Sequence, residues 1–416
     1  MLSNAINHTV VDRFLKYVTY DTQSREGSDS YPSTDKQKIL GAVLVEELKA
    51  MGLKNAAMDK YGYVMATLPA NTKKPVPAIG LIAHMDTSPD VSGKDVKPIV
   101  HKNYMGGDIV LPGDLSQVLR ETDNPALAEQ KGNDIITSDG TTLLGADNKA
   151  GIAEIFDAVH YFIEHPDEEH GKICIAITPD EEIGEGTKYF DTKKFGAEFA
   201  YTIDGESAGY VENETFSADS VTLRIHGNNV HPGYAKDKMI NAIKIMAEII
   251  DQLPKDKLSP ETTESREGYI HPNSIAGGVE NTSVKFLIRD FRVEGLERLE
   301  QTLRTIANNV LEKYPGATMD FEVEESYRNM KYKLDHAPHV VENALEAVRR
   351  AGLKPVLHMI RGGTDGARLS FEGLPTPNIF TGGHNFHSKI EWISVQDMKK
   401  AVETIIHIVK LTAERA

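Results

Sequence analysis

Histidine and carboxylate side chains follow several apolar runs of this sequence. His84 and Asp86 come directly after the run "AIGLIA" at residues 78–83. Residues i and i+2 of a strand share a face, and ligands of open parallel sheets bind at the carboxyl ends of the strands. Asp86 could therefore accept the second ring N–H of His84 and raise its basicity as a metal ligand. The alternative is a histidine that a nearby carboxylate merely caps.

Four other segments repeat this arrangement of polar residues. They supply Asp180, Glu181 and Glu182 in "PDEEIGEG", Asp204 in "FAYTIDGES", Asp147 in "LLGADNKAG", and His384 and His387 in "FTGGHNFHSKIEW". Each segment alone also has a plain structural explanation: a solvated loop for the glutamates, a helix N-cap for Asp147, a surface position for either histidine. Together, histidines and carboxylates from five segments suit zinc, with cobalt or manganese as substitutes.

Strands that alternate with helices must position these residues, and this alternation predicts an α/β domain with a mainly parallel sheet. The pattern predicts helices at 5–20, 36–51, 340–352 and 395–413, one that starts at about 149, and strands at 62–69, 78–85, 172–179, 197–204, 354–361 and 376–381. Residues 87–135 contain scattered Gly and Pro. We expect them to form a long irregular insertion, of the kind that often surrounds a site.

A second domain is predicted within the first. The segment 212–327 shows in turn a strand at 217–227, a helix at 238–253, two strands within 268–292, a helix at 295–314 and a strand at 317–327. This β-α-β-β-α-β order is typical of the ferredoxin-like fold. We therefore expect a catalytic domain at 1–211 and 328–416, interrupted by an inserted lid domain at 212–327.

Composition limits the partners and the compartment. The 416 residues include 62 acidic and 46 basic ones, a net charge of −16, which argues against nucleic acid as the main partner and favours solubility. The single cysteine, Cys174, cannot form an intrachain disulfide. No signal peptide is recognisable at the N-terminus, and no apolar run approaches the roughly 20 residues that span a bilayer. We expect a cytoplasmic protein without membrane contact.

Several motifs together resemble one known family. The motifs "HMDT", "GADNKAG", "PDEEIGEG", "HPG", "RGGTDGARLS" and "GLPTPNIFTGGHNFHSKIEW" are similar to those of the co-catalytic zinc aminopeptidase, aminoacylase and carboxypeptidase G family. Their order and the C-terminal third resemble the tripeptide-cleaving members. The resemblance extends over nearly the whole chain. It implies a two-zinc catalytic domain with an inserted lid, which also dimerises.

The same resemblance implies the metal ligands. They would be His84, Asp147, Glu182, Asp204 and His387, with Asp147 bridging two zinc ions. His387 is preferred because it precedes Glu391 with the family's HxxxE spacing, and His384 remains the alternative. The resemblance further implies a cis peptide after Asp147.

The family chemistry assigns roles to two more carboxylates. Asp86 would orient His84, and Glu181 would be the general base. Two divalent cations and three ligating carboxylates leave a surplus of about one positive charge, which favours hydroxide over water between the metals. Glu181 would take that proton and pass it to the leaving amine.

Four residues are candidates for substrate binding. By resemblance, His231 in "NNVHPG" would stabilise the oxyanion, often in the partner subunit, although it could be a simple turn histidine before Pro232. Asn281 and Arg289 resemble lid residues that hold the substrate carboxylate, although an arginine in a strand is often just exposed. Arg361 could also bind a carboxylate, because guanidinium does so through two hydrogen bonds.

We therefore expect a dinuclear zinc aminopeptidase that removes the N-terminal residue of tripeptides and acts as a homodimer. Other hydrolases of the same family, such as a dipeptidase, a carboxypeptidase or a deacylase, are the closest alternatives. A peptide-binding module without catalysis would be expected to lack some of the metal ligands, and this sequence lacks none. A purely structural zinc site is disfavoured because such sites are usually rich in cysteine.

Overall fold

The computed structural model describes residues 6–416, which divide into two compact units. Unit 1 comprises the chain through Asn213, Met330–Met359 and Thr364–Ala416, and unit 2 comprises Glu214–Asn329 and Ile360–Gly363. The chain thus leaves unit 1 at Glu214, builds nearly all of unit 2, returns at Met330, and enters unit 2 again only for Ile360–Gly363. Within residues 6–416, no helix combines the length and the apolar character needed to cross a membrane.

Unit 1 is built on an eight-stranded sheet with the order β1-β2-β8-β3-β9-β16-β10-β15. The strands are β1 (Ala57–Met58), β2 (Val64–Leu68), β3 (Ile79–His84), β8 (Ile173–Thr178), β9 (Phe199–Gly205), β10 (Tyr210–Thr215), β15 (Val356–Ile360) and β16 (Asn378–Phe380). The α/β class is confirmed. The sheet is mixed, because β8, β3, β9 and β16 pair in parallel, while β2 and β10 join them antiparallel.

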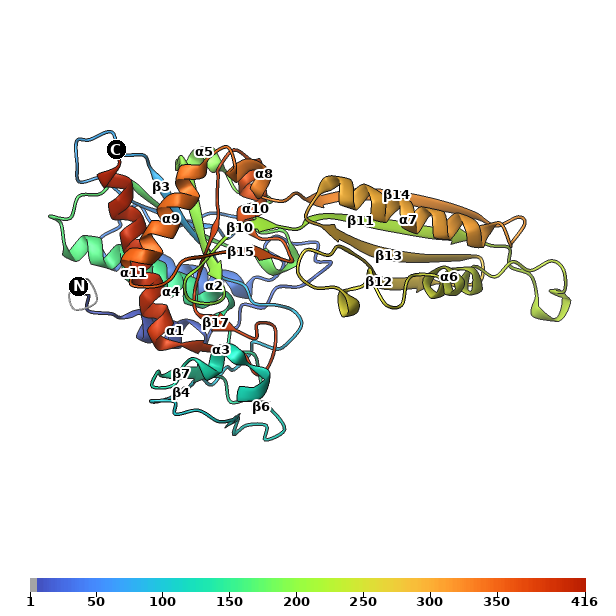
Figure 1. The fold of residues 1–416 in the computed structure, drawn as a ribbon, viewed down its shortest axis with the longest axis horizontal. Coiled ribbons are helices and arrows are strands. Elements are labelled where there is room, and N and C mark those ends of the chain that lie inside the picture. Colours follow the sequence, from blue (N-terminus) through green and yellow to red (C-terminus); the bar gives the residue numbers. More distant parts are fainter. Residues whose placement is uncertain (1–5) are drawn as a thin grey trace. The chain divides into compact units, whose positions relative to one another are not determined.

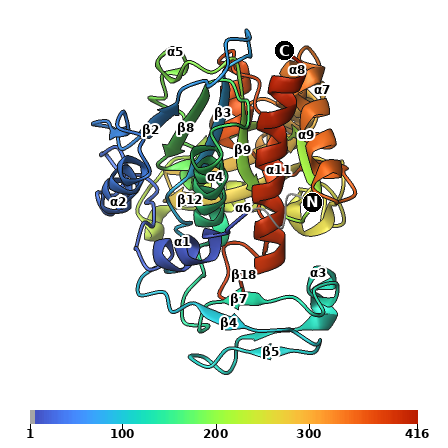
Figure 2. The same ribbon diagram turned by 90° about the vertical axis from the view of Figure 1, so that its left-hand side faces the viewer.

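Helices cover both faces of this sheet. They are α1 (Val10–Tyr17), α2 (Lys36–Ala50), α4 (Ala146–Glu164), α5 (Thr192–Phe195), α8 (Lys331–Leu334), α9 (Pro338–Arg350), α10 (Asp365–Phe371) and α11 (Val395–Glu414). Helix α4 contacts β3 and β9, and α1 and α11 pack on α4, as Figures 1 and 2 show. Helix α5 contacts β8, and α10 contacts β9. Buried apolar strands between helical layers are the arrangement that the alternating pattern predicts.

The close approach of α4 to β9 requires glycine. A Cβ atom at Gly151 would lie 2.0 Å from the backbone oxygen of Ile203, far inside van der Waals contact. Residue 151 therefore cannot carry a side chain unless helix and strand move apart. This contact places the start of α4 next to the end of β9, where Asp204 lies.

The starts of two predicted helices can be compared with the structure. The predicted helix 5–20 is α1, which covers only Val10–Tyr17, and residue 5 lies outside the described part of the chain. Helix α4 is bounded by Ala146 and Glu164, but its backbone is non-helical at Asp147 and Asn148, so the regular helix runs from Lys149, as predicted. The bond between these two residues is the implied cis peptide.

The segment 87–135, predicted to be irregular, contains short elements. They are β4 (Ile99–His101), β5 (Ile109–Val110), β6 (Val118–Leu119), α3 (Pro125–Ala128) and, at its end, β7 (Ile135–Thr137). Strands β4 and β7 join β17 (Gly383–His384) and β18 (Trp392–Ser394) in a four-stranded sheet with the order β17-β18-β7-β4. Two- and three-residue strands have no periodicity of their own, so only their distant partners reveal them.

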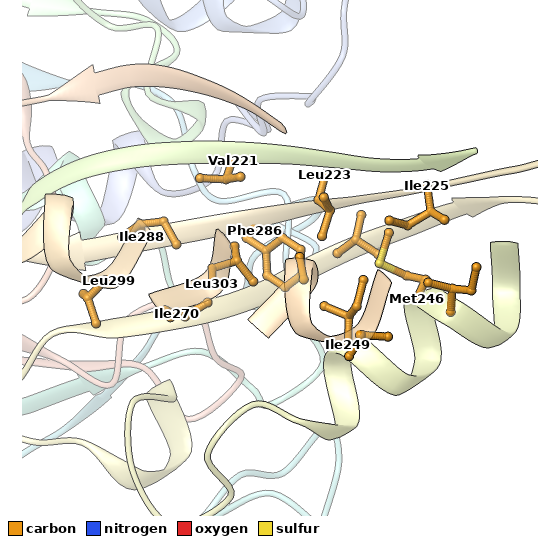
Figure 3. Close-up of a cluster of buried hydrophobic side chains, with 14 of the residues drawn as sticks. Val221, Leu223, Ile225, Met246, Ile249, Ile270, Phe286, Ile288, Leu299 and Leu303 are labelled. Atoms are coloured by element: carbon orange, nitrogen blue, oxygen red, sulfur yellow. The ribbon is translucent and has the colours of Figure 1, made fainter. Parts of the chain in front are cut away.

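Unit 2 has the predicted β-α-β-β-α-β order. Its elements are β11 (Ser217–His226), α6 (Ala242–Asp251), β12 (Tyr269–Gly277), β13 (Asn281–Asp290), α7 (Val293–Leu311) and β14 (Thr318–Tyr327). The antiparallel sheet has the order β12-β13-β11-β14. Figure 3 shows Val221, Leu223 and Phe286 of the sheet with Met246 and Ile249 of α6, all buried in one core. Alternate strand residues therefore face the helices.

Candidate metal centre

Three neighbouring parallel strands bring the site residues to one edge of the unit 1 sheet. Strand β3 ends at His84, and its register pairs His84 with Thr178, the last residue of β8. Strand β9, on the other side of β3, carries Asp204 one residue before its end. The carboxyl ends of parallel strands meet at one edge of a sheet, and this explains why residues far apart in sequence lie together.

Five side chains form two groups that could each hold a metal ion. The first group is His84, Asp147 and Asp204, and the second is Asp147, Glu182 and His387. In the first, His84 Nε2 lies 2.9 Å from Asp147 Oδ1 and 3.4 Å from Asp204 Oδ1. In the second, His387 Nε2 lies 3.2 Å from Asp147 Oδ2 and 2.8 Å from Glu182 Oε2. Asp147 thus offers one oxygen to each group.

Asp86 is fully buried and contacts two parts of the site. Its carboxylate accepts hydrogen bonds from the backbone N–H groups of Glu181 at 3.0 Å and Glu182 at 3.2 Å. His84 Nδ1 lies 3.1 Å from the backbone oxygen of Asp86 and 3.4 Å from its carboxylate. The backbone carbonyl is therefore the closer partner for the second ring nitrogen, and the carboxylate also holds the segment that carries Glu181 and Glu182.

Glu391 supports the loop that carries Asp147. Its buried carboxylate accepts hydrogen bonds from the backbone N–H groups of Leu144 and Gly145, both at 2.7 Å, and of Asp147 at 3.0 Å. Asp147 makes no capping hydrogen bond at the start of α4, where Gly145 is the N-cap residue. The structure therefore gives Asp147 a different surrounding from the N-cap alternative.

The site concentrates negative charge away from water. Burial raises the pKa of Glu182 to about 8 and that of Asp204 to about 6, and the Asp147 carboxylate adds to both increases. Burial opposes the charge on His387, but hydrogen bonds with Asp147 and Glu182 outweigh it and raise the pKa of His387 to about 11. The same kind of contact, from His387 and His84, holds the pKa of Asp147 well below its usual range despite burial. The raised pKa values of Glu182 and Asp204 show that the positive charge around them does not balance their negative charge.

The donor set fits two divalent cations. Glu182 Oε1 is buried and has no hydrogen-bond partner within residues 6–416, which is costly for a carboxylate oxygen unless a cation binds it. Imidazole nitrogens and carboxylate oxygens are ligands that zinc accepts, and cysteine, which structural zinc sites favour, contributes nothing here. A carboxylate that offers one oxygen to each of two groups has the geometry of a bridging ligand.

Glu181 lies beside this donor set without belonging to it. It begins the short 3-10 helix Glu181–Ile183, directly before Glu182. Burial raises the pKa of Glu181 well above its ordinary value; His84 opposes the rise, and Asp204 adds to it. A carboxyl whose proton affinity is raised, next to two metal-competent groups, is suited to accept a proton in catalysis.

The two candidate histidines of the C-terminal motif occupy different surroundings. His387 belongs to the second metal-competent group. The His384 ring is buried and stacks on Trp392, with ring centroids 4.3 Å apart, and its Nδ1 lies 3.7 Å from Glu206 Oε1. The choice of His387 as the ligand stays a prediction, and the geometry favours it.

Two of the predicted substrate-binding residues already have polar partners within unit 2. Arg289 donates from Nη1 to the backbone oxygens of Ile288 at 2.9 Å and Asp219 at 3.3 Å. Asn281 Oδ1 lies 2.6 Å from His226 Nδ1. Each of these contacts gives the residue a structural role besides the predicted one. Their binding of substrate remains a prediction.

The other two candidates of unit 2 differ sharply. Arg361 donates to the backbone oxygens of Ser265, Glu267 and Thr263 at 2.9–3.3 Å, so this loop surrounds its guanidinium. His231 is exposed, and within residues 6–416 its Nδ1 accepts a hydrogen bond only from the nearby Gly233 N–H. The contacts of Arg361 are structural, whereas the His231 ring is open to a ligand.

The sequence analysis did not identify a group of buried polar residues around Asp180, which directly precedes Glu181. Ser33 and Gln37 are buried and contact Asp180. A signal for Gln37 was present, since it continues the stripe of Leu40, Leu44 and Leu48 on α2, all buried. A polar residue at a core position of an amphipathic helix needs a buried partner.

Known proteins resemble the chain along nearly its whole length. The family model described as the peptidase dimerisation domain matches residues 213–315. A protein named peptidase T from Clostridium acetobutylicum is 53% identical over 98% of this chain and 99% of its own length. A peptidase T from Geobacillus is 50% identical over 99% of this chain and all of its own.

A solved structure agrees with these relatives. The crystal structure of aminopeptidase PepT from Bacillus cereus superposes with a TM-score of 0.72 at 25% identity, covering 97% of this chain and 98% of that one. Identity of about half, sustained from end to end, exceeds what a shared fold alone produces. The chain therefore belongs to the peptidase T family.

Proposed function

We propose that this protein is a dinuclear zinc aminopeptidase that removes the N-terminal residue of tripeptides. One observation carries the proposal: two metal-competent groups share the carboxylate of Asp147. Membership of the peptidase T family supports the reaction and the substrate class. A carboxylate shared by two metal ions would hold them close together, as two-metal hydrolysis requires, whereas peptide binding alone needs no such pair.

The proposal assigns His84, Asp147, Glu182, Asp204 and His387 as the ligands of two zinc ions. Bound zinc would polarise the scissile carbonyl and make a bound water more acidic. The Glu181 carboxylate accepts the proton from the attacking water and returns it to the departing amine. Its raised pKa supports this role, because a base must hold the proton until the amine leaves.

The remaining residues bind and position. Asp86 keeps Glu181 and Glu182 in place through their backbone N–H groups. Among the candidates of unit 2, the proposal retains His231 for the oxyanion and Asn281, Arg289 and Arg361 for the substrate carboxylate. For Arg361 this requires exchange of backbone partners, so it is the least favoured of the four.

Unit 2 supplies the association of subunits in this proposal. The match of residues 213–315 to a peptidase dimerisation domain supports a homodimer. The activity of mixed dimers would show whether His231 acts on the substrate of its own subunit or on that of the partner. The expected location is the cytoplasm, where short peptides are the products of protein breakdown.

The test is product analysis on a peptide panel with zinc-reconstituted protein. Tri-alanine should yield alanine and di-alanine, while di-alanine, acetyl-alanine and acetyl-tri-alanine should remain intact. Cleavage of acetyl-tri-alanine would contradict the aminopeptidase assignment, because that peptide has no free amino group. Preferred cleavage of di-alanine or acetyl-alanine would instead indicate a dipeptidase or a deacylase.

A further inference from the structure

Asp180, directly before Glu181, is held in an unusual surrounding. Its side chain is fully buried and its backbone is left-handed, with φ 57°. The carboxylate accepts hydrogen bonds from Ser33 N and Ser33 Oγ, both at 2.5 Å, and from Gln37 Nε2 at 2.6 Å. The Asp180 backbone N–H donates to Gln37 Oε1 at 3.2 Å. Asp180, Ser33 and Gln37, named here the Asp180 bracket, satisfy one another.

This network is built for rigidity. Buried polar groups that are fully hydrogen-bonded fix a unique arrangement of their segments. Aspartate is one of the few residues that adopt left-handed backbone at modest cost, so residue 180 can turn the chain sharply out of β8. None of the three side chains belongs to the metal-competent groups. The bracket therefore acts on the chain, not on a metal ion.

A second set of contacts holds the far end of the same segment. Tyr31 Oη donates to the backbone oxygen of Glu185 at 3.1 Å, and Tyr63 Oη donates to that of Gly186 at 2.9 Å. The two tyrosine hydroxyls lie 2.6 Å apart. Segment 180–186 is thus fixed at both ends by residues of one short stretch, 31–37, together with Tyr63.

We infer that Asp180, held by Ser33 and Gln37, is a positioning residue that sets the Glu181 carboxylate for proton transfer. The inference rests on the proposed function, which makes Glu181 the base. A catalytic carboxylate must be held to within about 0.5 Å, and a misplacement of about 1 Å can cost roughly 100-fold in rate. Glu181 is bonded to Asp180 and has its own N–H fixed by Asp86. A shift of Asp180 therefore moves Glu181 directly.

The variant Asp180→Asn tests this inference with little change of size or backbone preference. In the wild type, the Asp180 carboxylate accepts hydrogen bonds from three donors. The amide NH₂ of the variant cannot accept a hydrogen bond, so at least one of the three is lost and the bracket loosens. We expect kcat on tri-alanine to fall by about tenfold or more, with KM within twofold of the wild-type value and metal content unchanged. Asp95→Asn is the matched control, because Asp95 is exposed and also left-handed, with φ 59°. It should leave kcat unchanged.

Ser33 provides a test of the hydroxyl. Ser33→Ala keeps the backbone N–H and removes the Oγ donor, so kcat should fall, and Ser33→Thr should restore most of it. Loss of folding alone would lower the amount of folded enzyme and not the kcat of each metal-loaded site. A wild-type kcat in Asp180→Asn would overturn the inference.

A measurement without substrate separates the inference from the proposed function. In metal-free protein, hydrogen exchange of the backbone amides of residues 181–186 should become faster in Asp180→Asn than in Asp95→Asn. If the wild type cleaves no peptide, the proposed function fails, and this exchange still tests the bracket. Equal exchange of residues 181–186 in the two variants would show that the bracket does not hold them.

Discussion

Replacing Glu391 should weaken metal binding although Glu391 is not a proposed ligand. Its buried carboxylate accepts three backbone N–H groups, those of Leu144, Gly145 and Asp147. In Glu391→Gln the amide oxygen can take the place of Oε2 and accept from Leu144 and Gly145. The amide nitrogen then faces the N–H of Asp147, and this one donor loses its partner.

The size of the effect follows from that one donor. A buried N–H without a partner costs about 1–3 kcal/mol. In the metal-free variant, the loop can move so that this N–H finds another partner. Metal binding then has to return the loop to its original position at a cost of the same roughly 1–3 kcal/mol, so metal affinity falls by about 5- to 140-fold. Glu391→Ala leaves three donors without the carboxylate, so its effect should be larger still and should include the free energy of unfolding.

Competition with a chelator measures this affinity. Burial raises the pKa of Glu391 to about 7, so zinc should be titrated at pH 8, where the carboxylate of the wild type is ionised. Glu46→Gln is the control, because the Glu46 side chain is 74% exposed and forms an ion pair with the exposed Lys49. If Glu391→Gln bound zinc as tightly as Glu46→Gln does, the loop would not depend on Glu391 and the argument would be refuted.

Three further predictions address the base, the fold and the pH dependence of stability. Glu181→Gln should lower kcat by about 10²–10⁴-fold with zinc still bound, and retained turnover would remove Glu181 as the base. Gly151→Ala should destabilise unit 1 by about 1–3 kcal/mol, because the new Cβ meets Ile203; an unchanged urea midpoint would contradict this close contact. Burial lowers the pKa of His407 from 6.5 to about 4, so the unfolded state binds more protons and stability falls as the pH drops from about 6.5 towards 4. The full shift corresponds to about 3 kcal/mol, which solvent screening reduces to about 1 kcal/mol, and His407→Gln should flatten the urea midpoint over that pH range if the assignment holds.

The sequence predicted the elements that have a strong period of their own. Strands β3, β8 and β9 are continuous apolar runs, and unit 2 shows helical and alternating patterns in an order that has few folded solutions. Strand β10, between β16 and β15, was not predicted, because Glu212 and Glu214 interrupt its apolar pattern. Both side chains are nevertheless buried, so tertiary contacts decide the conformation there.

The candidate site shows the same limit. Residues at strand ends could be found because topology brings strand ends together, and this brought out His84, Asp204 and Glu182. The supporting groups could not be found in this way. The Asp180 bracket joins β8 to the start of α2, more than 140 residues away in sequence, and no local pattern encodes that pairing.

The most direct test of the account is a zinc titration of metal-stripped protein while tri-alanine hydrolysis is followed. Two groups that share Asp147 predict that two zinc ions bind each chain and that hydrolysis requires them. Hydrolysis by the metal-free protein would contradict this account, and so would two bound ions per chain with tri-alanine left intact.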